Sequence, residues 1–314
     1  MDAIANLLEG TRARGAFALR CVMSKPWGLR VLAESPATLV APVQGDLWVV
    51  PDGGDPLHVR PGGVVVTRAP DHYNVTAAPD VEPNIIIHPG QRCCDREGVS
   101  VLEEMTHGVR TWGNDPKGDC VFIVGAYEHL STVSDKLVKV LPPILSLGSH
   151  DWNSPLISLL VEEVIKDEPG QAAVLDRLLD LLLTAALKAW AAKQDDTRPG
   201  LWRSQGDPVV ARALQLIHAD PAEAWTLEKL ASQSNASRAS LARRFNDIIG
   251  EPPMTFLKNW RMALAEDLLN KPDETIGTVS EKVGYASPFA FSTAFKRARG
   301  ISPHEYRARA KEGG

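Results

Sequence analysis

The side chains best placed for chemistry are two adjacent cysteines, Cys93 and Cys94, which lie among arginines. Nearby positive charge lowers the pKa of a thiol and favours the reactive thiolate. Adjacent cysteines rarely join each other because the geometry is strained, so a redox pair would link one of them to Cys21 or Cys120. The other interpretation is that all four are ordinary reduced thiols, as expected of a long chain in which we find no secretory leader.

Three histidines in separate apolar segments, His58, His72 and His88, are the weak candidates for a metal site. Metal-dependent oxygenases hold their metal with clustered histidines and a carboxylate. This sequence has no His-x-His pair, phosphate-binding glycine loop, nucleophile elbow or His-Glu-x-x-His motif. We therefore expect surface histidines, no cofactor and no catalytic activity, with a cupin-type metal-dependent enzyme as the alternative.

Three tryptophans, Trp27, Trp48 and Trp112, are candidates for lining a pocket that holds an apolar or aromatic effector. Such pockets are rich in aromatic side chains. Aromatic residues in strands also serve as plain core, and that interpretation stays open.

The elements that must position these side chains are short apolar segments separated by Gly, Pro and Asp. Many short strands with turn signals predict a β-sandwich or barrel, and we favour a cupin-like β-barrel. The predicted strands are 16–22, 37–43, 47–50, 57–60, 64–67, 73–76, 85–88, 99–102 and 121–127.

Two amphipathic helices follow, over 153–166 and 171–193. The apolar surface of the second is wider than one sheet face covers, because Val174 and Leu181 broaden the stripe that contains Leu175 and Leu182. That surface is either core within the chain or the interface of a homodimer, and both interpretations stay open. We expect residues 1–195 to form a sensing and dimerisation domain, followed by a linker at 196–206.

Charge is unevenly distributed along the 314 residues. Residues 1–199 carry 18 Lys and Arg against 26 Asp and Glu, whereas residues 200–314 carry 16 against 13. The two parts therefore suggest different tasks, although the small positive excess is weak support for nucleic-acid binding by itself. The most apolar run, 174–190, is interrupted by charged residues, so we expect no membrane span and a cytoplasmic protein.

The most specific pattern lies in Thr275–Arg297, where two short helical segments meet at Gly284. Glycine can adopt the left-handed conformation that ends a helix, and Ser287 followed by Pro288 provides an N-cap and a first helical residue. This arrangement is typical of a helix-turn-helix motif. The chain repeats it over Thr226–Phe245.

A long helix is predicted over 253–270, between the two copies of the motif. Met254, Leu257, Leu264 and Leu268 are expected on the face of this helix that touches both motifs.

These residues resemble the AraC/XylS family of transcription regulators. The resemblance is specific over about the last hundred residues, through Gly284-Tyr285, Phe295-Lys296, Ser302-Pro303 and Tyr306-Arg307. The N-terminal part is similar, more loosely, to the cupin-type ligand-binding domain of one branch of that family, through segments such as Gly108–Gly113.

The resemblance implies that both recognition helices enter successive major-groove segments on one face of double-stranded DNA. It assigns exposed recognition positions to Ser237, Arg238, Ser240, Arg243, Ser292, Thr293, Lys296 and Arg297. Arg243 is suited to a bidentate contact with guanine, whereas Lys296 and Arg297 are placed for phosphates. We therefore expect the first motif to supply most of the base readout and the second mainly to position the protein.

We thus expect an α+β protein with a cupin-like β-barrel and two following helices, then an all-α domain over 207–308 with two helix-turn-helix motifs joined by a long helix, and a tail at 309–314. The expected function is sequence-specific transcription regulation in response to a small-molecule or redox signal. The resemblance further implies RNA polymerase and a second copy of the chain as partners. A constitutive DNA-architectural protein without an effector is a further alternative.

Overall fold

The computed structural model describes residues 17–127, 141–152, 155–193, 207–271 and 273–312. The predicted linker at 196–206 lies outside these ranges. Contacts along the chain divide it into two compact units, one containing the strands with helices α3 (Leu156–Val164) and α4 (Gln171–Lys193), the other containing everything from residue 207 onward. Within the described ranges, no helix combines the length and apolar character needed to cross a bilayer.

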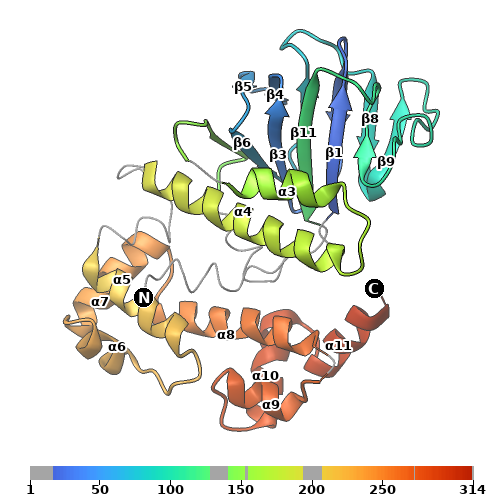
Figure 1. Cartoon of the computed structure of the whole chain (residues 1–314). Helices are drawn as coiled ribbons and strands as arrows, with labels where there is room; N and C mark the ends of the chain where they lie inside the picture. Colours follow the sequence, from blue (N-terminus) through green and yellow to red (C-terminus); the bar gives the residue numbers. More distant parts are fainter. Residues whose placement is uncertain (1–16, 128–140, 153–154, 194–206, 272, 313–314) are drawn as a thin grey trace. The chain divides into compact units, whose positions relative to one another are not determined.

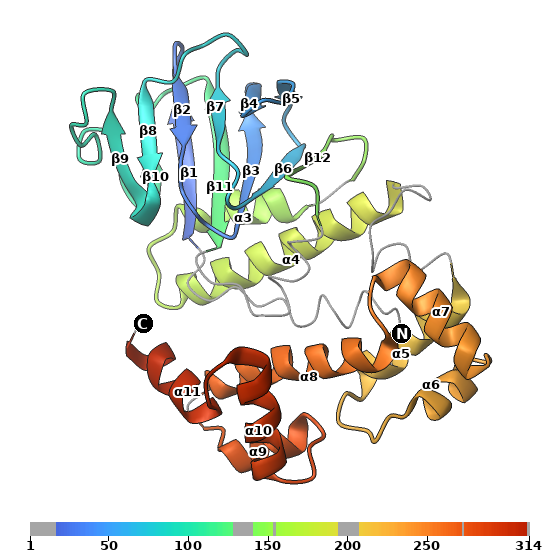
Figure 2. The ribbon, with the colours of Figure 1, turned by 180° about the vertical axis from the view of Figure 1, so that it is seen from behind.

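The first unit is a sandwich of two six-stranded sheets, seen from its two sides in Figures 1 and 2. The first sheet has the order β10-β1-β11-β3-β6-β12 and the second the order β5-β4-β7-β2-β8-β9. Neighbouring strands are antiparallel except for the pairs β1–β10 and β2–β8, which are parallel. The first sheet consists of β1 (Phe17–Met23), β3 (Ala37–Gln44), β6 (Val64–Arg68), β10 (Thr111–Trp112), β11 (Cys120–Tyr127) and β12 (Ile144–Leu147). The second consists of β2 (Gly28–Val31), β4 (Leu47–Pro51), β5 (Leu57–Val59), β7 (Tyr73–Thr76), β8 (Ile85–His88) and β9 (Arg92–Asp95), with a short turn of helix, η1 (Pro89–Gln91), before β9.

The predicted cupin-like β-barrel is confirmed as a strand-rich unit followed by two helices, but its closure into a barrel is not, because the two sheets stay separate. In a closed barrel every strand has two neighbours, whereas each of these sheets ends in two edge strands. Side chains occupy part of the space between the sheets, as where the Trp27 ring stacks on Phe122 at a centroid distance of 5.5 Å. The segment predicted as a strand at 99–102 makes a single bridge, between Ser100 and Cys94, and belongs to a loop.

Strand β11 connects the core between the sheets to the helices outside them. Because successive side chains point to opposite faces of a sheet, Phe122 and Val124 face the second sheet while Gly125 and Tyr127 face α4. A Cβ atom on Gly125 would lie 2.4 Å from Cδ2 of Leu179, so a larger residue at this position would force the buried Leu179 side chain to move. Figure 1 shows α3 and α4 covering the outer face of the first sheet.

The second unit is all helical and confirms the two predicted helix-turn-helix motifs. The first motif consists of α6 and α7, the second of α9 and α10, and α8 joins them. The bounds are α5 (Pro208–Ala219), α6 (Leu227–Gln233), α7 (Arg238–Ile249), α8 (Pro253–Leu269), α9 (Ile276–Lys282), α10 (Pro288–Arg299) and α11 (Pro303–Glu312).

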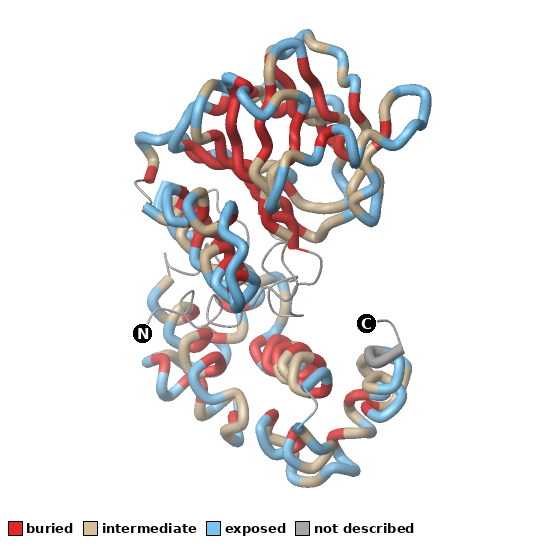
Figure 3. Tube along the Cα trace, turned by 45° about the vertical axis from the view of Figure 1, so that its right-hand side comes forward, coloured by how far each residue is buried: buried red, intermediate tan, exposed pale blue. Residues whose placement is uncertain are grey.

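Helix α8 divides its buried side chains between the two motifs. Phe256 packs edge-on against Phe245 of the first motif, whereas Met262 and Leu269 belong to the core of the second with Phe291 and Phe295. Of the four residues predicted to contact the motifs, Leu257 is buried, and Leu264 and Leu268 pack, partly buried, against the core of the second motif. Met254 was predicted wrongly, since it is 37% exposed. Because α8 packs against both motifs, its buried residues, which include Phe256, Trp260 and Met262, lie on more than one side of the helix. Figure 3 colours the buried residues of the chain red.

Candidate nucleic-acid interface and effector cavity

The two recognition helices, α7 and α10, begin and end in the same way. Ser237 and Ser287 each occupy the N-cap and accept a hydrogen bond at 3.2 Å, from the amides of Ser240 and Ala290. Each helix ends at a glycine in the left-handed conformation, φ 88° and 80°. These local signals are the ones that prolong a short helix by satisfying its terminal backbone groups.

On α7, the arginines differ in what they contact. Arg238 donates to Glu228 of α6 at 2.5 Å, and Arg244 pairs with Asp207 at 3.3 Å. Arg243 is exposed and makes no hydrogen bond or ion pair within the described part of the chain. Arg243 is therefore the arginine of α7 that is ready to meet an external acceptor.

On α10, the exposed surface is apolar at its start and cationic at its end. Phe289 is 82% exposed. The Thr293 hydroxyl donates to the carbonyl of Phe289 at 3.0 Å, so its proton is used within the helix. Lys296 and Arg297 are exposed in the last turn, where cations also suit the helix dipole.

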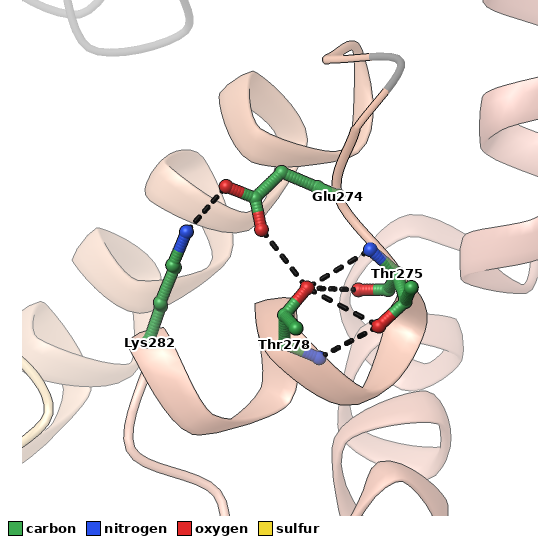
Figure 4. A network of polar contacts seen from close by, with 4 residues as sticks. All are labelled: Glu274, Thr275, Thr278 and Lys282. Atoms are coloured by element: carbon green, nitrogen blue, oxygen red, sulfur yellow. Dashed lines mark hydrogen bonds and ion pairs between the residues drawn. The ribbon is translucent and has the colours of Figure 1, made fainter.

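The short helix α9 is fixed at its start by a network of side chains (Figure 4). Thr275 and Thr278 cap each other, the Thr275 hydroxyl accepting from the Thr278 amide and the Thr278 hydroxyl from the Thr275 amide. Glu274 accepts from the Thr278 hydroxyl at 2.9 Å and also pairs with Lys282. The Lys282 bond holds the pKa of the Glu274 carboxyl below its usual range. The network supports a seven-residue helix that would be marginal alone.

Arg261 of α8 ties the first motif to the second. Its guanidinium donates to the carbonyl oxygens of Pro221 and Glu223, which precede α6, at 2.7 Å each. It also donates to the carbonyl of Gly284, in the turn of the second motif, at 3.2 Å. Gly284 has φ 72°, and a Cβ there would lie 2.4 Å from the Ala222 carbonyl oxygen. One side chain and one glycine thus hold the two motifs at a fixed separation.

A cavity of about 420 Å³ lies between the two sheets of the first unit. Most of its lining is apolar, and β1, β11 and the second sheet all contribute to it. Apolar lining residues include Phe17, Leu19, Leu29, Val31, Val75, Ile87, Phe122 and Val124. This size and this lining are typical of sites for small apolar molecules.

Comparison with known proteins agrees with both units. Residues 2–192 match the family model described as "Cupin", and residues 230–309 match the one described as "Helix-turn-helix domain". A "Putative AraC-like transcription regulator" of Streptomyces lividans is 26% identical over 313 residues, which cover 98% of each chain. The chain belongs to the cupin-type, AraC-like transcription regulators.

Other relatives of the regulator carry related names. The "RCS-specific HTH-type transcriptional activator RclR" of Escherichia coli is 26% identical over 314 residues, covering 99% of each chain. "HTH-type transcriptional regulator AlkR" of Acinetobacter baylyi is 34% identical over 163 residues, about half of each chain. Among solved structures, the DNA-binding domain of AdpA in complex with a target DNA is 31% identical and covers 34% of this chain and 95% of that chain, with a TM-score of 0.32.

The three tryptophans of the regulator lie in different surroundings. Trp112 lines the cavity. Trp27 is buried in the same core but stacks on Phe122 and does not appear in the cavity lining. Trp48 stacks on His58 at a centroid distance of 4.5 Å, also away from the lining.

The four cysteines are free thiols, and two of them share the cavity. Cys21 and Cys93 both line it, whereas Cys94 and Cys120 are buried elsewhere. Burial raises the pKa of Cys93 to about 11 and that of Cys120 to about 12. Burial raises the pKa of Cys21 further, and the nearby Cys93 adds to that shift. The arginines near Cys93 in the sequence therefore do not give this thiol the low pKa that a reactive cysteine requires.

The histidines proposed as metal ligands are not brought together. His58 contacts Asp46 at 2.9 Å, His72 lies in the turn before β7, and His88 ends β8. Within the described ranges, no three metal-binding side chains converge on one point.

Sequence reasoning missed two residues that the structure singles out. Arg110 lines the cavity, and its signal was present as a lone arginine in the Gly108–Gly113 segment. Tyr127 links β11 to α4 through its hydroxyl, which donates to the Leu179 carbonyl. No local pattern predicts that contact, because the two residues lie 52 positions apart.

Proposed function

We propose that a small molecule binds between the two sheets and that its binding changes the population of the regulator competent to bind DNA. The observation that carries this proposal is the double role of β11. Phe122 and Val124 line the cavity, and Tyr127 on the opposite face donates to the Leu179 carbonyl of α4 at 2.7 Å. A ligand that displaces β11 therefore also displaces α4. The ligand shifts the equilibrium between two arrangements of β11 and α4 to the extent that it binds one arrangement more tightly than the other.

The outer surface of α3 and α4 is the proposed contact between two copies of the regulator. Leu159, Val174 and Leu181 are large apolar side chains that are 49%, 45% and 54% exposed. Val174 and Leu181 are seven residues apart on α4, so they lie on one stripe of the helix. Exposed apolar groups in such a stripe are typical of an interface.

The DNA-binding unit is proposed to divide its work between its two motifs. The free guanidinium of Arg243 supports base readout by α7, and the exposed Lys296 and Arg297 support phosphate contacts by α10. Phe289 can pack against a thymine methyl group. RNA polymerase as a further partner rests on the family resemblance alone.

We infer that the regulator acts by binding and not by catalysis, in keeping with relatives named as transcription regulators. Ligand binding is preferred over thiol oxidation as the signal, since burial keeps Cys21 and Cys93 protonated. A constitutive DNA-architectural protein needs no effector, so that alternative does not account for the cavity.

The test uses the full chain and an operator obtained by selection from random DNA. A panel of small apolar compounds is titrated while tryptophan fluorescence is followed, since Trp112 lines the cavity. Operator affinity is then measured by anisotropy with and without each compound that binds. Val124→Phe, which fills the cavity, should abolish both the binding and the operator response. Compounds that bind wild type, fail to bind Val124→Phe and leave operator affinity unchanged would refute the proposal.

A further inference from the structure

The cavity has a mostly apolar wall with one charged side chain. Of the described residues that line it, Arg110 is the one that carries a charge, and no Asp or Glu is among them. Arg110 is partly buried, and its guanidinium makes no hydrogen bond or ion pair to any described residue. A partly buried guanidinium with five donors and no carboxylate partner is available to an acceptor group on a ligand.

The backbone around Arg110 is held in place by strand β1. The amide of Arg20 donates to the Arg110 carbonyl at 2.8 Å, and Arg110 itself has φ 45°, in the left-handed region. A non-glycine residue in that conformation persists where surrounding contacts fix it. The loop therefore presents Arg110 to the cavity in a defined position.

Several hydroxyl groups of the lining are already engaged within the protein. Thr106 donates to the Leu102 carbonyl at 2.6 Å and Thr111 to the Val109 carbonyl at 3.0 Å. The Tyr73 hydroxyl is hydrogen-bonded to Thr38 and Thr67. Besides Arg110, the described polar side chains of the lining without such a bond are Ser35 and Gln91. A sugar or other polyol would therefore leave most of its own hydroxyls unpaired here, and unpaired buried polar groups are costly.

We propose that the effector is an apolar monoanion, such as a medium-chain or aryl-alkyl monocarboxylate, whose charged end pairs with Arg110 and whose body fills the space between the sheets. This inference rests on the proposed function of the cavity as the effector site. Arginine is suited to the role because its planar fork binds a carboxylate through two parallel hydrogen bonds. The excess of acidic residues over residues 1–199 repels anions at long range, so the selectivity must come from this local contact.

The size of the cavity limits the ligand further. A volume of about 420 Å³ corresponds to roughly 14 water molecules at ~30 Å³ each. A single chain or ring system of about ten to fourteen non-hydrogen atoms fits such a space.

The experiment compares three probes with one alkyl body and different ends: octanoate, 1-octanol and octylamine. Each is titrated into the full chain while tryptophan fluorescence is followed. Octanoate should bind at least tenfold more tightly than the other two, because charge-assisted hydrogen bonds are the stronger ones. Arg110→Gln should reduce octanoate affinity at least tenfold and leave 1-octanol within about twofold, while Arg110→Lys should keep part of the preference.

Arg20→Gln is the matched control, since Arg20 lies on β1 between the lining residues Leu19 and Cys21 and faces the other side of the sheet. This variant should bind all three probes as wild type does. The inference is overturned if 1-octanol binds as tightly as octanoate, if none of the three binds, or if the preference for octanoate survives in Arg110→Gln.

Operator affinity measured in parallel separates this inference from the proposed function. Selective binding of octanoate without any change in operator affinity would sustain the ligand class and refute the regulatory role. An operator response to 1-octanol equal to that for octanoate would refute the ligand class and sustain the regulatory role.

Discussion

The hydroxyl of Tyr127 donates to the backbone carbonyl of Leu179 at 2.7 Å, joining the last residue of β11 to the middle of α4. Both side chains are almost fully buried. Apolar packing alone would allow the helix to slide over the sheet, whereas a directional hydrogen bond fixes one position along its axis. The contact therefore defines where α4 sits relative to the strand that lines the cavity.

Tyr127→Phe should separate ligand binding from its effect on DNA. The substitution keeps the ring and removes one buried hydrogen bond, so the free energy of unfolding should fall by about 1 kcal/mol. Affinity for octanoate, or for any other compound shown to occupy the cavity, should stay within about twofold, while the change in operator affinity on binding should shrink. Urea denaturation, fluorescence titration and anisotropy measure the three quantities. An undiminished operator response in the variant would exclude this contact from the coupling.

The same tyrosine predicts a loss of stability at high pH. Burial, with the negative charge of Asp180 as a smaller cause, raises the pKa of Tyr127 well above its ordinary value of 10.0. Above pH 10 the unfolded chain releases this proton while the folded chain retains it, so the unfolded state binds fewer protons. The free energy of unfolding should therefore fall as pH rises from 10 toward the folded pKa. Tyr127→Phe should make this fall shallower, and identical slopes would contradict the assignment.

The motifs could be predicted from the sequence because their signals are local. Ser237, Ser287 and Gly284 take the cap and turn conformations that their residue types favour. The separation of the two sheets and the burial of α8 on more than one side could not be predicted from the sequence, because both depend on contacts with residues far away in the chain. The place of Arg110 in the cavity wall could not be predicted for the same reason, because the cavity forms only where the two sheets pack together.

Arg243→Ala should relax sequence preference at one base pair of the operator, at a cost of about 1–3 kcal/mol in affinity for the preferred site. Thr293→Ala should have a smaller effect, because its hydroxyl already donates to Phe289. Lys296→Ala should leave the preference unchanged and lower the slope of log affinity against log salt by about 1. Site selection and salt titration with each variant test this division. A larger loss of sequence preference in Thr293→Ala than in Arg243→Ala would reverse it.

Arg261→Ala should loosen the spacing between the two motifs. Wild type is expected to lose affinity steeply when base pairs are inserted between the two halves of its operator, and the variant less steeply. The loss of three donated hydrogen bonds should also lower the free energy of unfolding by more than about 2 kcal/mol. Gly284→Ala disturbs the same junction through strain, so the two changes should be non-additive in a double-mutant cycle. If operator affinity depends on the inserted base pairs in Arg261→Ala as it does in wild type, Arg261 only stabilises the fold and does not set the spacing of the motifs.

Leu181→Glu should weaken self-association of the full chain. Leu181 is 54% exposed on α4, so a carboxylate there is solvated in a monomer but buried in the proposed dimer, where it is costly. Sedimentation velocity over a range of concentrations should show a shift toward monomer with little change in thermal stability. Val99→Glu, at an apolar residue that is 61% exposed in the loop after β9, is the control for one added negative charge away from α4. Equal self-association of Leu181→Glu and wild type would place the interface elsewhere.

The thiols should react slowly in the folded regulator, which distinguishes a ligand sensor from a redox sensor. With a pKa of about 11, Cys93 at pH 8 has roughly 100-fold less thiolate than a cysteine of ordinary pKa. Its alkylation by iodoacetamide should therefore be slow, rise about tenfold per pH unit near pH 8 and disappear in Cys93→Ser, while Cys21 should react later still because it is fully buried. Protein unfolded in urea gives the unprotected rates for comparison. Rapid oxidation of Cys21 and Cys93 by dilute peroxide at neutral pH, together with a change in operator affinity, would instead establish the cavity thiols as the sensor.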